Sequence, residues 1–211
     1  ILATELLKKD PRIDPERVFI IGHSMGGMLS PRIDAEGGNY AGLIIMAGSP
    51  RKLEEIILDQ NEAALRSTKG FVNWIVKKQV AKFAAMFDGM YELSDAEAKK
   101  KKMGGGTTLY YFKEMGEHAA SAYLSSCEKP ILIMQGEKDF QATAEKDFAA
   151  YKQLLAGRSN VTFRLYENLS HAFVPSVYGD IMKAKQEYNV KQHISDKVIG
   201  DIASWINNTT P

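Results

Sequence analysis

One short segment constrains the fold of this chain more than any other: the glycine-flanked serine of residues 22–26, Gly-His-Ser-Met-Gly. It fits the pattern G-x-S-x-G. The preceding run, Arg17 to Ile21, is almost continuously apolar and β-branched or aromatic, which predicts a strand buried on both faces of a parallel sheet. Residues 28–34 can form a helix. A serine between such a strand and a helix is typical of a nucleophile elbow, and the alternative is an ordinary glycine-rich turn, phosphate-binding loops included.

A nucleophile elbow would hold the side chain of Ser24 out of the sheet in a strained backbone conformation. Glycine on both flanks, at Gly22 and Gly26, is expected to let the strand and the helix approach closely, because no side chain stands between them. The serine then lies at a helix N-terminus, where the backbone N–H of Met25 and the helix dipole stabilise negative charge. Ser24 is therefore the candidate nucleophile and Met25 the candidate oxyanion donor.

Three further segments predict strands of the same sheet. Residues 40–47 and 130–136 are short apolar runs, and residues 161–166 alternate apolar and polar side chains. Helical patterns occupy 143–155 and 195–207. Strands that alternate with helices imply right-handed parallel crossovers, so the predicted fold class is α/β with a parallel sheet.

Residues 51–127 differ from the rest of the chain. Apolar residues recur there at helical spacing, as in 53–58 and 71–91, and no run clearly predicts a strand. We therefore expect a core made of residues 1–50 and 128–211, with a helical layer inserted between its two parts.

A serine hydroxyl is a poor nucleophile at its ordinary pKa, so it needs a histidine as general base. The chain has four histidines. His171 follows the fourth predicted strand, where the chain order serine, acid, histidine places a base, so it is the preferred candidate. His23 is adjacent to the serine and cannot easily turn back onto it. His118 lies in the helical insertion, and His193 precedes the last helix, where capping or packing is the simpler role.

The histidine in turn needs an acid that fixes its tautomer. Asp139 follows the third predicted strand and enters a loop at the catalytic edge of the sheet, so it is the preferred acid. Glu137 is nearer the strand end and could substitute. Asp147 falls in the next predicted helix, which indicates solvated surface rather than a catalytic role.

The segments 22–29 (GHSMGGML), 136–139 (GEKD) and 169–173 (LSHAF) together resemble bacterial α/β-hydrolases of the esterase and dienelactone-hydrolase-like groups. The resemblance implies a serine triad acting on esters, thioesters or related acyl compounds, and a helical lid inserted after the second strand seen here. It gives the triad roles to Ser24, Asp139 and His171, and one oxyanion N–H to Met25.

The resemblance covers only the sheet portions, and it also implies a second oxyanion N–H on a loop in a preceding half of the sheet. Loss of one such donor costs about 100- to 1000-fold in rate. The chain starts at Ile1, inside an amphipathic helical pattern and without an initiator Met. We therefore expect missing residues upstream and an exposed edge on the elbow strand, through which the chain could self-associate.

The insertion is the predicted source of substrate choice. Phe71, Trp74, Met86 and Phe87 belong to a set of large apolar residues that could line an acyl pocket, because methionine and aromatic side chains make adaptable apolar walls. The competing interpretation is that most of them pack the insertion onto the body. The other members are Leu53, Ile56, Ile57, Ile75, Phe83 and Met90.

Composition limits the partners of the chain. Lysine and arginine total 27 against 26 acidic residues, and a net charge of +1 gives no strong field to attract nucleic acid or an anionic membrane. No segment approaches the roughly 20 consecutive apolar residues of a membrane span. Cys127 is the single cysteine, which fits a reducing compartment and a disulfide-free secreted protein about equally. Localisation stays open, with the cytoplasm slightly favoured.

The sequence thus predicts a serine hydrolase that cleaves a carboxylic ester or related small acyl compound, with no metal or cofactor implied. Thioesterase and peptidase chemistry stay open, since fold analogy does not choose among them. The alternative from another class is a non-catalytic α/β-hydrolase-like binding module that acts through its lid and its open edge.

Overall fold

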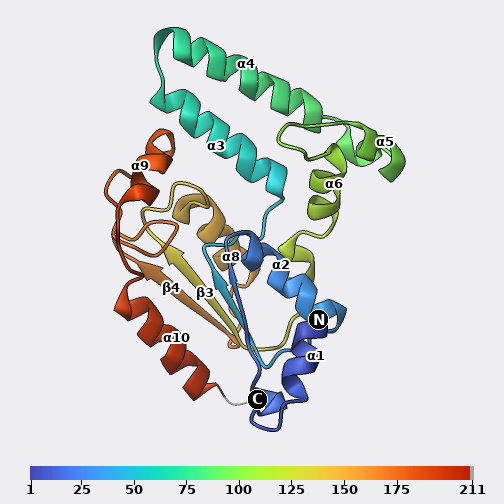
Figure 1. The fold of residues 1–211 in the computed structure, drawn as a ribbon, viewed down its shortest axis with the longest axis vertical. Coiled ribbons are helices and arrows are strands. Elements are labelled where there is room, and N and C mark those ends of the chain that lie inside the picture. The colour runs from blue at the N-terminus through green and yellow to red at the C-terminus, as the bar shows by residue number, and fades with distance from the viewer. Residues whose placement is uncertain (210–211) are drawn as a thin grey trace.

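The computed structural model describes residues 1–209, and its centre is a four-stranded parallel sheet (Figure 1). The strands lie in the order β1 (Ile20–His23), β2 (Leu43–Met46), β3 (Ile131–Gly136) and β4 (Val161–Tyr166). Every neighbouring pair is parallel. The predicted α/β fold with a parallel sheet is confirmed.

Helices cover both faces of this sheet, because successive side chains of a buried strand point to opposite sides. On one face α10 (Asp196–Asn208) packs against an apolar cluster, and on the other α2 (Met25–Ile33), α7 (Ala120–Leu124) and α8 (Ala149–Leu154) pack against a second cluster or its strands. The first cluster includes Ile44, Met46, Leu132, Met134 and Val198, and the second includes Ile45, Ile131, Ile133, Tyr151 and Leu155.

Several predicted boundaries shift by a few residues. The strand before the serine begins at Ile20 and not at Arg17, because Pro15–Arg17 forms a 3-10 turn (η1). The helix after the serine begins at Met25, three residues before the predicted start. The predicted helix over 143–155 consists of a π-helical turn, η4 (Ala144–Phe148), followed by α8.

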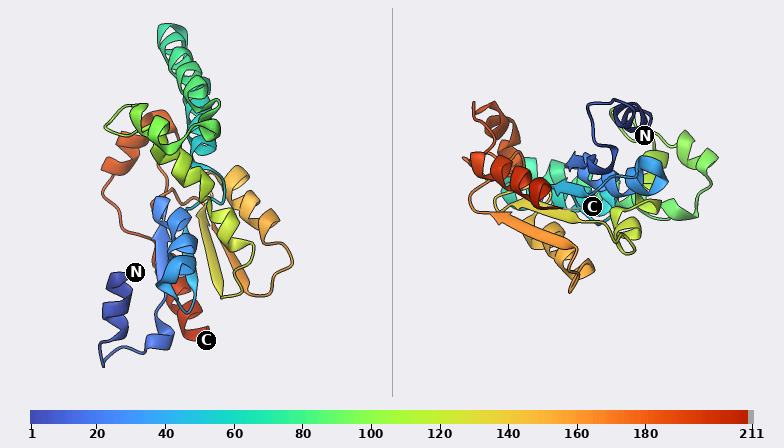
Figure 2. Two further views of the ribbon diagram at one scale, coloured as in Figure 1. Left: turned by 90° about the vertical axis from the view of Figure 1, so that its right-hand side faces the viewer. Right: turned by 90° about the horizontal axis from the view of Figure 1, so that it is seen from below.

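Between β2 and β3 the chain forms α3 (Leu53–Ser67), α4 (Gly70–Phe87), α5 (Asp95–Lys100) and α6 (Leu109–Glu117), which we call the arm, residues 53–117. Figures 1 and 2 show α3 and α4 projecting away from the sheet as a pair. The arm has an apolar cluster of its own, formed by Phe87, Met90, Met103, Leu109 and Phe112.

The helix that follows the arm, α7, packs on the sheet through Ala120 and Leu124. The predicted division of the chain into a core and an insertion over 51–127 therefore stays a prediction, and the segment that leaves the sheet ends at α6. The remaining elements are α1 (Leu2–Lys8), η2 (Asp34–Gly38), η3 (Met90–Glu92), η5 (Ile181–Lys183) and α9 (Ala184–Asn189).

Strand β1 is one edge of the sheet, and within residues 1–209 only β2 pairs with it. The side chain of Ile21 on this strand is 52% exposed, and the apolar side chains of Leu2 and Leu6 on α1 are exposed as well. None of the helices described over 1–209 is both long enough and apolar enough to cross a membrane.

Candidate active site

Ser24 occupies a sharp turn between β1 and α2 with φ 55° and ψ −119°, which is a strained conformation for a residue with a side chain. Such strain costs about 1–3 kcal/mol and persists only where neighbouring groups fix the backbone. Here the Ser24 N–H donates to the Met46 carbonyl at 2.8 Å, and the Ser24 carbonyl accepts from the N–H of Gly27 at 2.9 Å. The turn is therefore anchored to β2 on one side and to α2 on the other.

Close backbone contacts favour glycine on both sides of this turn, but not at both predicted positions. A Cβ at Gly22 would lie 2.2 Å from the Gly26 carbonyl oxygen, a distance that no side chain tolerates. A Cβ at Gly26 would meet nothing within 4 Å, so the predicted packing role of Gly26 is wrong. The close contact belongs to Gly27, where a Cβ would lie 3.1 Å from the Gly22 carbonyl oxygen and 3.2 Å from Gly48.

The structure brings Ser24, His171 and Asp139 into one hydrogen-bonded line. The Nε2 atom of His171 lies 2.9 Å from the Ser24 hydroxyl oxygen, and its Nδ1 atom lies 2.7 Å from a carboxylate oxygen of Asp139. His171 and Asp139 are both buried. With Nδ1–H donating to the carboxylate, Nε2 is left free to accept the hydroxyl proton.

Asp139 is held by more than the histidine. Its carboxylate also accepts from the Gln135 side-chain amide at 2.8 Å, from the Gln141 N–H at 2.8 Å and from the Ala142 N–H at 3.1 Å. These donors satisfy a carboxylate that is only 4% exposed and fix its orientation toward the imidazole. The role of Gln135 was not predicted from the sequence, although it is a polar residue in a largely apolar strand.

The other acidic candidates lie elsewhere. Glu137 is exposed and accepts the Asn168 N–H, which lowers the pKa of its carboxyl group. Asp147 is only 2% exposed, so the prediction of solvated surface was wrong. It accepts from the Ser49 hydroxyl at 2.6 Å and from the Thr143 N–H at 2.7 Å, and burial raises its pKa.

The three remaining histidines are not bonded to the serine. His23 donates from Nε2 to the His171 carbonyl oxygen at 2.8 Å, and the two imidazole rings lie 4.9 Å apart. It therefore supports the backbone of the loop that holds His171. His118 pairs with the Tyr123 hydroxyl, and His193 is exposed. Over residues 1–209 no group of three or more His, Cys, Asp or Glu side chains has metal-binding geometry.

Met25 begins helix α2, so its N–H is one of the first-turn donors that have no partner inside the helix. Its side chain is 44% exposed, and its sulfur lies 3.1 Å from the hydroxyl of Tyr111 on α6. Tyr111 was not predictable as a neighbour of the turn, because helical spacing within the arm gives no sign of a contact with a residue 86 positions away.

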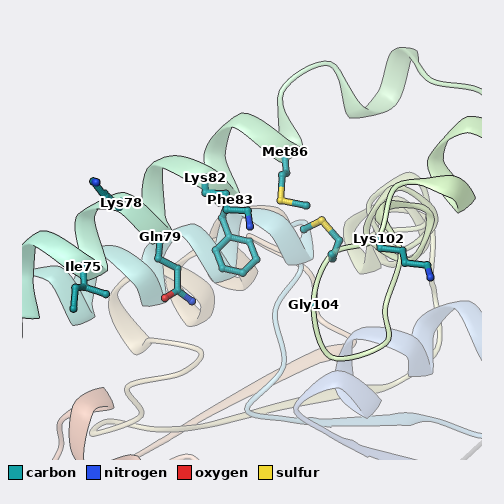
Figure 3. Close-up of a pocket in the computed structure, with 9 residues that line it drawn as sticks. Ile75, Lys78, Gln79, Lys82, Phe83, Met86, Lys102 and Gly104 are labelled. Atoms are coloured by element: carbon teal, nitrogen blue, oxygen red, sulfur yellow. The ribbon is translucent and has the colours of Figure 1, made fainter.

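The four predicted substrate-binding residues lie on α4, in different surroundings. Phe71 is 73% exposed and stacks on Trp74, which is 51% exposed. Phe87 is buried in the cluster of the arm. Met86 lines a cavity of about 500 Å³ between α4 and the loop at Gly104, shown in Figure 3. None of Ser24, Asp139 and His171 lines this cavity, so a substrate role for the four residues stays a prediction.

The parallel sheet, the strained serine turn and the helices on both faces define the α/β-hydrolase class. Within that class, residues 2–175 match the sequence profile of the family described as Serine aminopeptidase, S33, and the chain belongs to this family.

Esterase EstD of Thermotoga maritima is 29% identical to this chain over 204 residues, which are 97% of this chain and 45% of EstD. The chain therefore spans less than half the length of this relative. A solved esterase of Pyrococcus furiosus, PF2001, is similar in fold, with a TM-score of 0.50 at 12% identity over 99% of this chain and 59% of its own. An acylaminoacyl peptidase of Pyrococcus horikoshii has a TM-score of 0.45 at 15% identity. The match covers 80% of this chain and 22% of the peptidase.

Proposed function

We propose that this chain provides the catalytic centre of a serine hydrolase that cleaves a carboxylic ester or related acyl compound. The observation that supports this most strongly is the line of hydrogen bonds from Ser24 through His171 to Asp139, at 2.9 and 2.7 Å. The three residues are far apart in sequence and follow the ends of three different strands. An ordinary glycine-rich turn would not need a buried histidine and a buried carboxylate aligned on its serine.

In the proposed reaction, Nε2 of His171 takes the proton of the Ser24 hydroxyl while the oxygen attacks the ester carbonyl carbon. The negative charge on the former carbonyl oxygen is stabilised by the Met25 N–H and the positive end of α2. The intermediate collapses, and His171 returns the proton to the departing alcohol. Water, activated by His171, then releases the acid from Ser24. Asp139 holds the imidazole in the required tautomer throughout.

An ester substrate is favoured over a peptide because a relative that aligns with nearly the whole chain is named an esterase. The family description names an aminopeptidase, so peptide and thioester cleavage are the competing activities within the same chemistry. The proposed acyl-enzyme is common to all three, and only the leaving group differs.

The test is a hydrolysis panel on the intact protein: p-nitrophenyl esters of rising chain length, acyl thioesters and aminoacyl p-nitroanilides. We expect the esters to be cleaved fastest, with Ser24→Ala lowering kcat at least about 1000-fold. Ser125→Ala is the matched control, because Ser125 is exposed and its hydroxyl donates to the Ser121 carbonyl. Faster anilide cleavage would replace the ester assignment, and an inactive parent would favour the non-catalytic binding module.

We also propose that the arm selects the acyl group. The support is strongest for Met86, which lines the cavity in Figure 3 beside Phe83. Phe71 and Trp74 offer an exposed aromatic pair, and Phe87 belongs to the apolar cluster of the arm. A shift of the preferred chain length in Met86→Ala is the expected result, and an unchanged preference would argue against the assignment.

The free edge of β1 is the proposed surface for self-association, because an exposed strand edge pairs readily with another chain. Ile21 is the exposed apolar side chain on that strand. Sedimentation of this chain is expected to show dimers that Ile21→Lys reduces. A monodisperse monomer at high concentration would contradict the proposal.

A further inference from the structure

Helix α6 brings one polar group of the arm to the serine turn. The hydroxyl of Tyr111 lies 3.1 Å from the Met25 sulfur, while the backbone N–H of Met25 is the proposed oxyanion donor. The hydroxyl thus contacts the side chain of the same residue whose backbone N–H is proposed to stabilise the negative charge. This contact joins the arm to the residue that directly follows the nucleophile.

The hydrogen bond from the Tyr111 hydroxyl to the Met25 sulfur is weak. A phenol hydroxyl is a good hydrogen-bond donor, but a thioether sulfur is a weak acceptor. Tyr111 is half-buried, and burial raises its pKa, so the hydroxyl keeps its proton at neutral pH. The contact lies in an exposed position, where a ligand can reach the hydroxyl, and a ligand oxygen would be a better acceptor than the sulfur.

The surroundings allow the hydroxyl to change partners. Met25 is 44% exposed, and its unbranched side chain can rotate away at low cost. The ring of Tyr111 is held in place by an edge contact with Phe112, whose side chain belongs to the cluster of the arm, at 5.3 Å between ring centroids. The donor is therefore positioned by the arm, while its present acceptor is a partly exposed, unbranched side chain.

We infer that Tyr111 is a substrate-binding residue, whose hydroxyl donates to the carbonyl-derived oxygen of the bound acyl compound. This inference rests on the proposed function. A hydrogen bond to this oxygen strengthens as the oxygen becomes an anion, so it lowers the barrier more than it tightens substrate binding. The substrate class it fits is an acyl compound whose carbonyl oxygen lies between Met25 and α6.

The test compares Tyr111→Phe with Tyr110→Phe in the intact protein. Tyr110 precedes it on the same helix, and its ring packs against the Lys99 ammonium group at 4.2 Å. We expect Tyr111→Phe to lower kcat about 100-fold for p-nitrophenyl esters with little change in KM. Tyr110→Phe should keep kcat within about twofold. A kcat of Tyr111→Phe within threefold of the parent, or an equal loss in both variants, would overturn the inference.

Two further readouts separate this inference from the proposed function. Complete labelling of Ser24 by a fluorophosphonate in Tyr111→Phe, with an unchanged thermal midpoint, is expected, because the variant keeps the nucleophile and the ring. If the parent is not labelled, the proposed function fails. If the parent and Tyr111→Phe are both labelled and hydrolyse esters equally fast, only the role of Tyr111 fails.

Discussion

The serine turn and the arm are held in place by different forces. At the turn, backbone hydrogen bonds and glycine contacts fix the chain: Ser24 is bonded to Met46, and no side chain fits at Gly22. The arm instead has its own apolar cluster and exposes large aromatic side chains such as Phe71. The groups proposed to react therefore lie where hydrogen bonds and close contacts fix the backbone, whereas the groups proposed to choose the substrate lie on a helix with several exposed side chains.

Charged groups join the base of the arm to the body. Arg51, which follows β2, bonds to Asp59 on α3 at 2.6 Å and lies 3.5 Å from the buried Asp147. Lys146, beside Asp147, pairs with Asp59 as well. This charged network joins the segment after β2, helix α3 and η4.

The largest effect is expected at the fixed region, from Asp139→Asn. The amide disturbs the tautomer of His171, so kcat should fall about 10⁴-fold while the protein stays folded. Ester hydrolysis and circular dichroism measure the two quantities. Glu137→Gln, two residues away and exposed, is the control. A larger loss of activity in the control would assign the acid to Glu137.

A second comparison lies within the turn itself. Gly22→Ala should lower the free energy of unfolding by about 3 kcal/mol, because its methyl group collides with the Gly26 carbonyl. Gly26→Ala should change it by less than about 1 kcal/mol, since the added methyl group meets open space. Urea denaturation measures the free energy of unfolding of both variants. Equal losses at both positions would contradict the packing of the turn described above.

The stability of the protein is expected to depend on pH through Asp147, the buried member of this charged network. Burial raises the folded-state pKa of Asp147, so its contribution to stability is present below the ordinary aspartate pKa, near 4, and is lost as pH rises through the raised value. Asp147→Asn lacks this titration. The free energy of unfolding of the variant, relative to the parent, should therefore increase between about pH 4 and pH 7. A constant difference over this range would contradict the assignment.

The smallest effect is expected at the tip of the arm. Phe71→Ala should change the free energy of unfolding by less than about 0.5 kcal/mol, because the side chain is 73% exposed. Phe83→Ala, in the partly buried layer of the arm, should cost about 2 kcal/mol. Thermal unfolding compares the two. If Phe71 contacts substrate, KM for the longest ester also rises severalfold, and an unchanged KM would remove it from the proposed pocket.

The parts of this structure that depend on local pattern were predictable from the sequence. Strand β4 coincides with the predicted 161–166, and α10 is displaced by one residue from the predicted 195–207. Apolar side chains recur at the period of a strand in the first segment and at the period of a helix in the second. The positions of Asp139 and His171 followed from chain order, which places them after adjacent strands.

The parts that depend on tertiary contacts were not predictable. Asp147 has a helical and charged neighbourhood in sequence, yet Ser49 and Arg51 approach it from the end of β2 and bury it. The role of Gly27 depends on the backbone of Gly48, which lies on another strand end. Such contacts join residues that are far apart in sequence and produce no periodic pattern, so they cannot be predicted from periodicity.

The proposed roles of Ser24 and His171 are tested by the site and the rate of fluorophosphonate attachment. Trypsin releases residues 18–32, which contain Ser24 and Ser30, and fragmentation of this peptide distinguishes the two serines. We expect an adduct on Ser24 that forms at least about 100-fold more slowly in His171→Ala. An adduct on another residue, or an equal rate in His171→Ala, would contradict these roles.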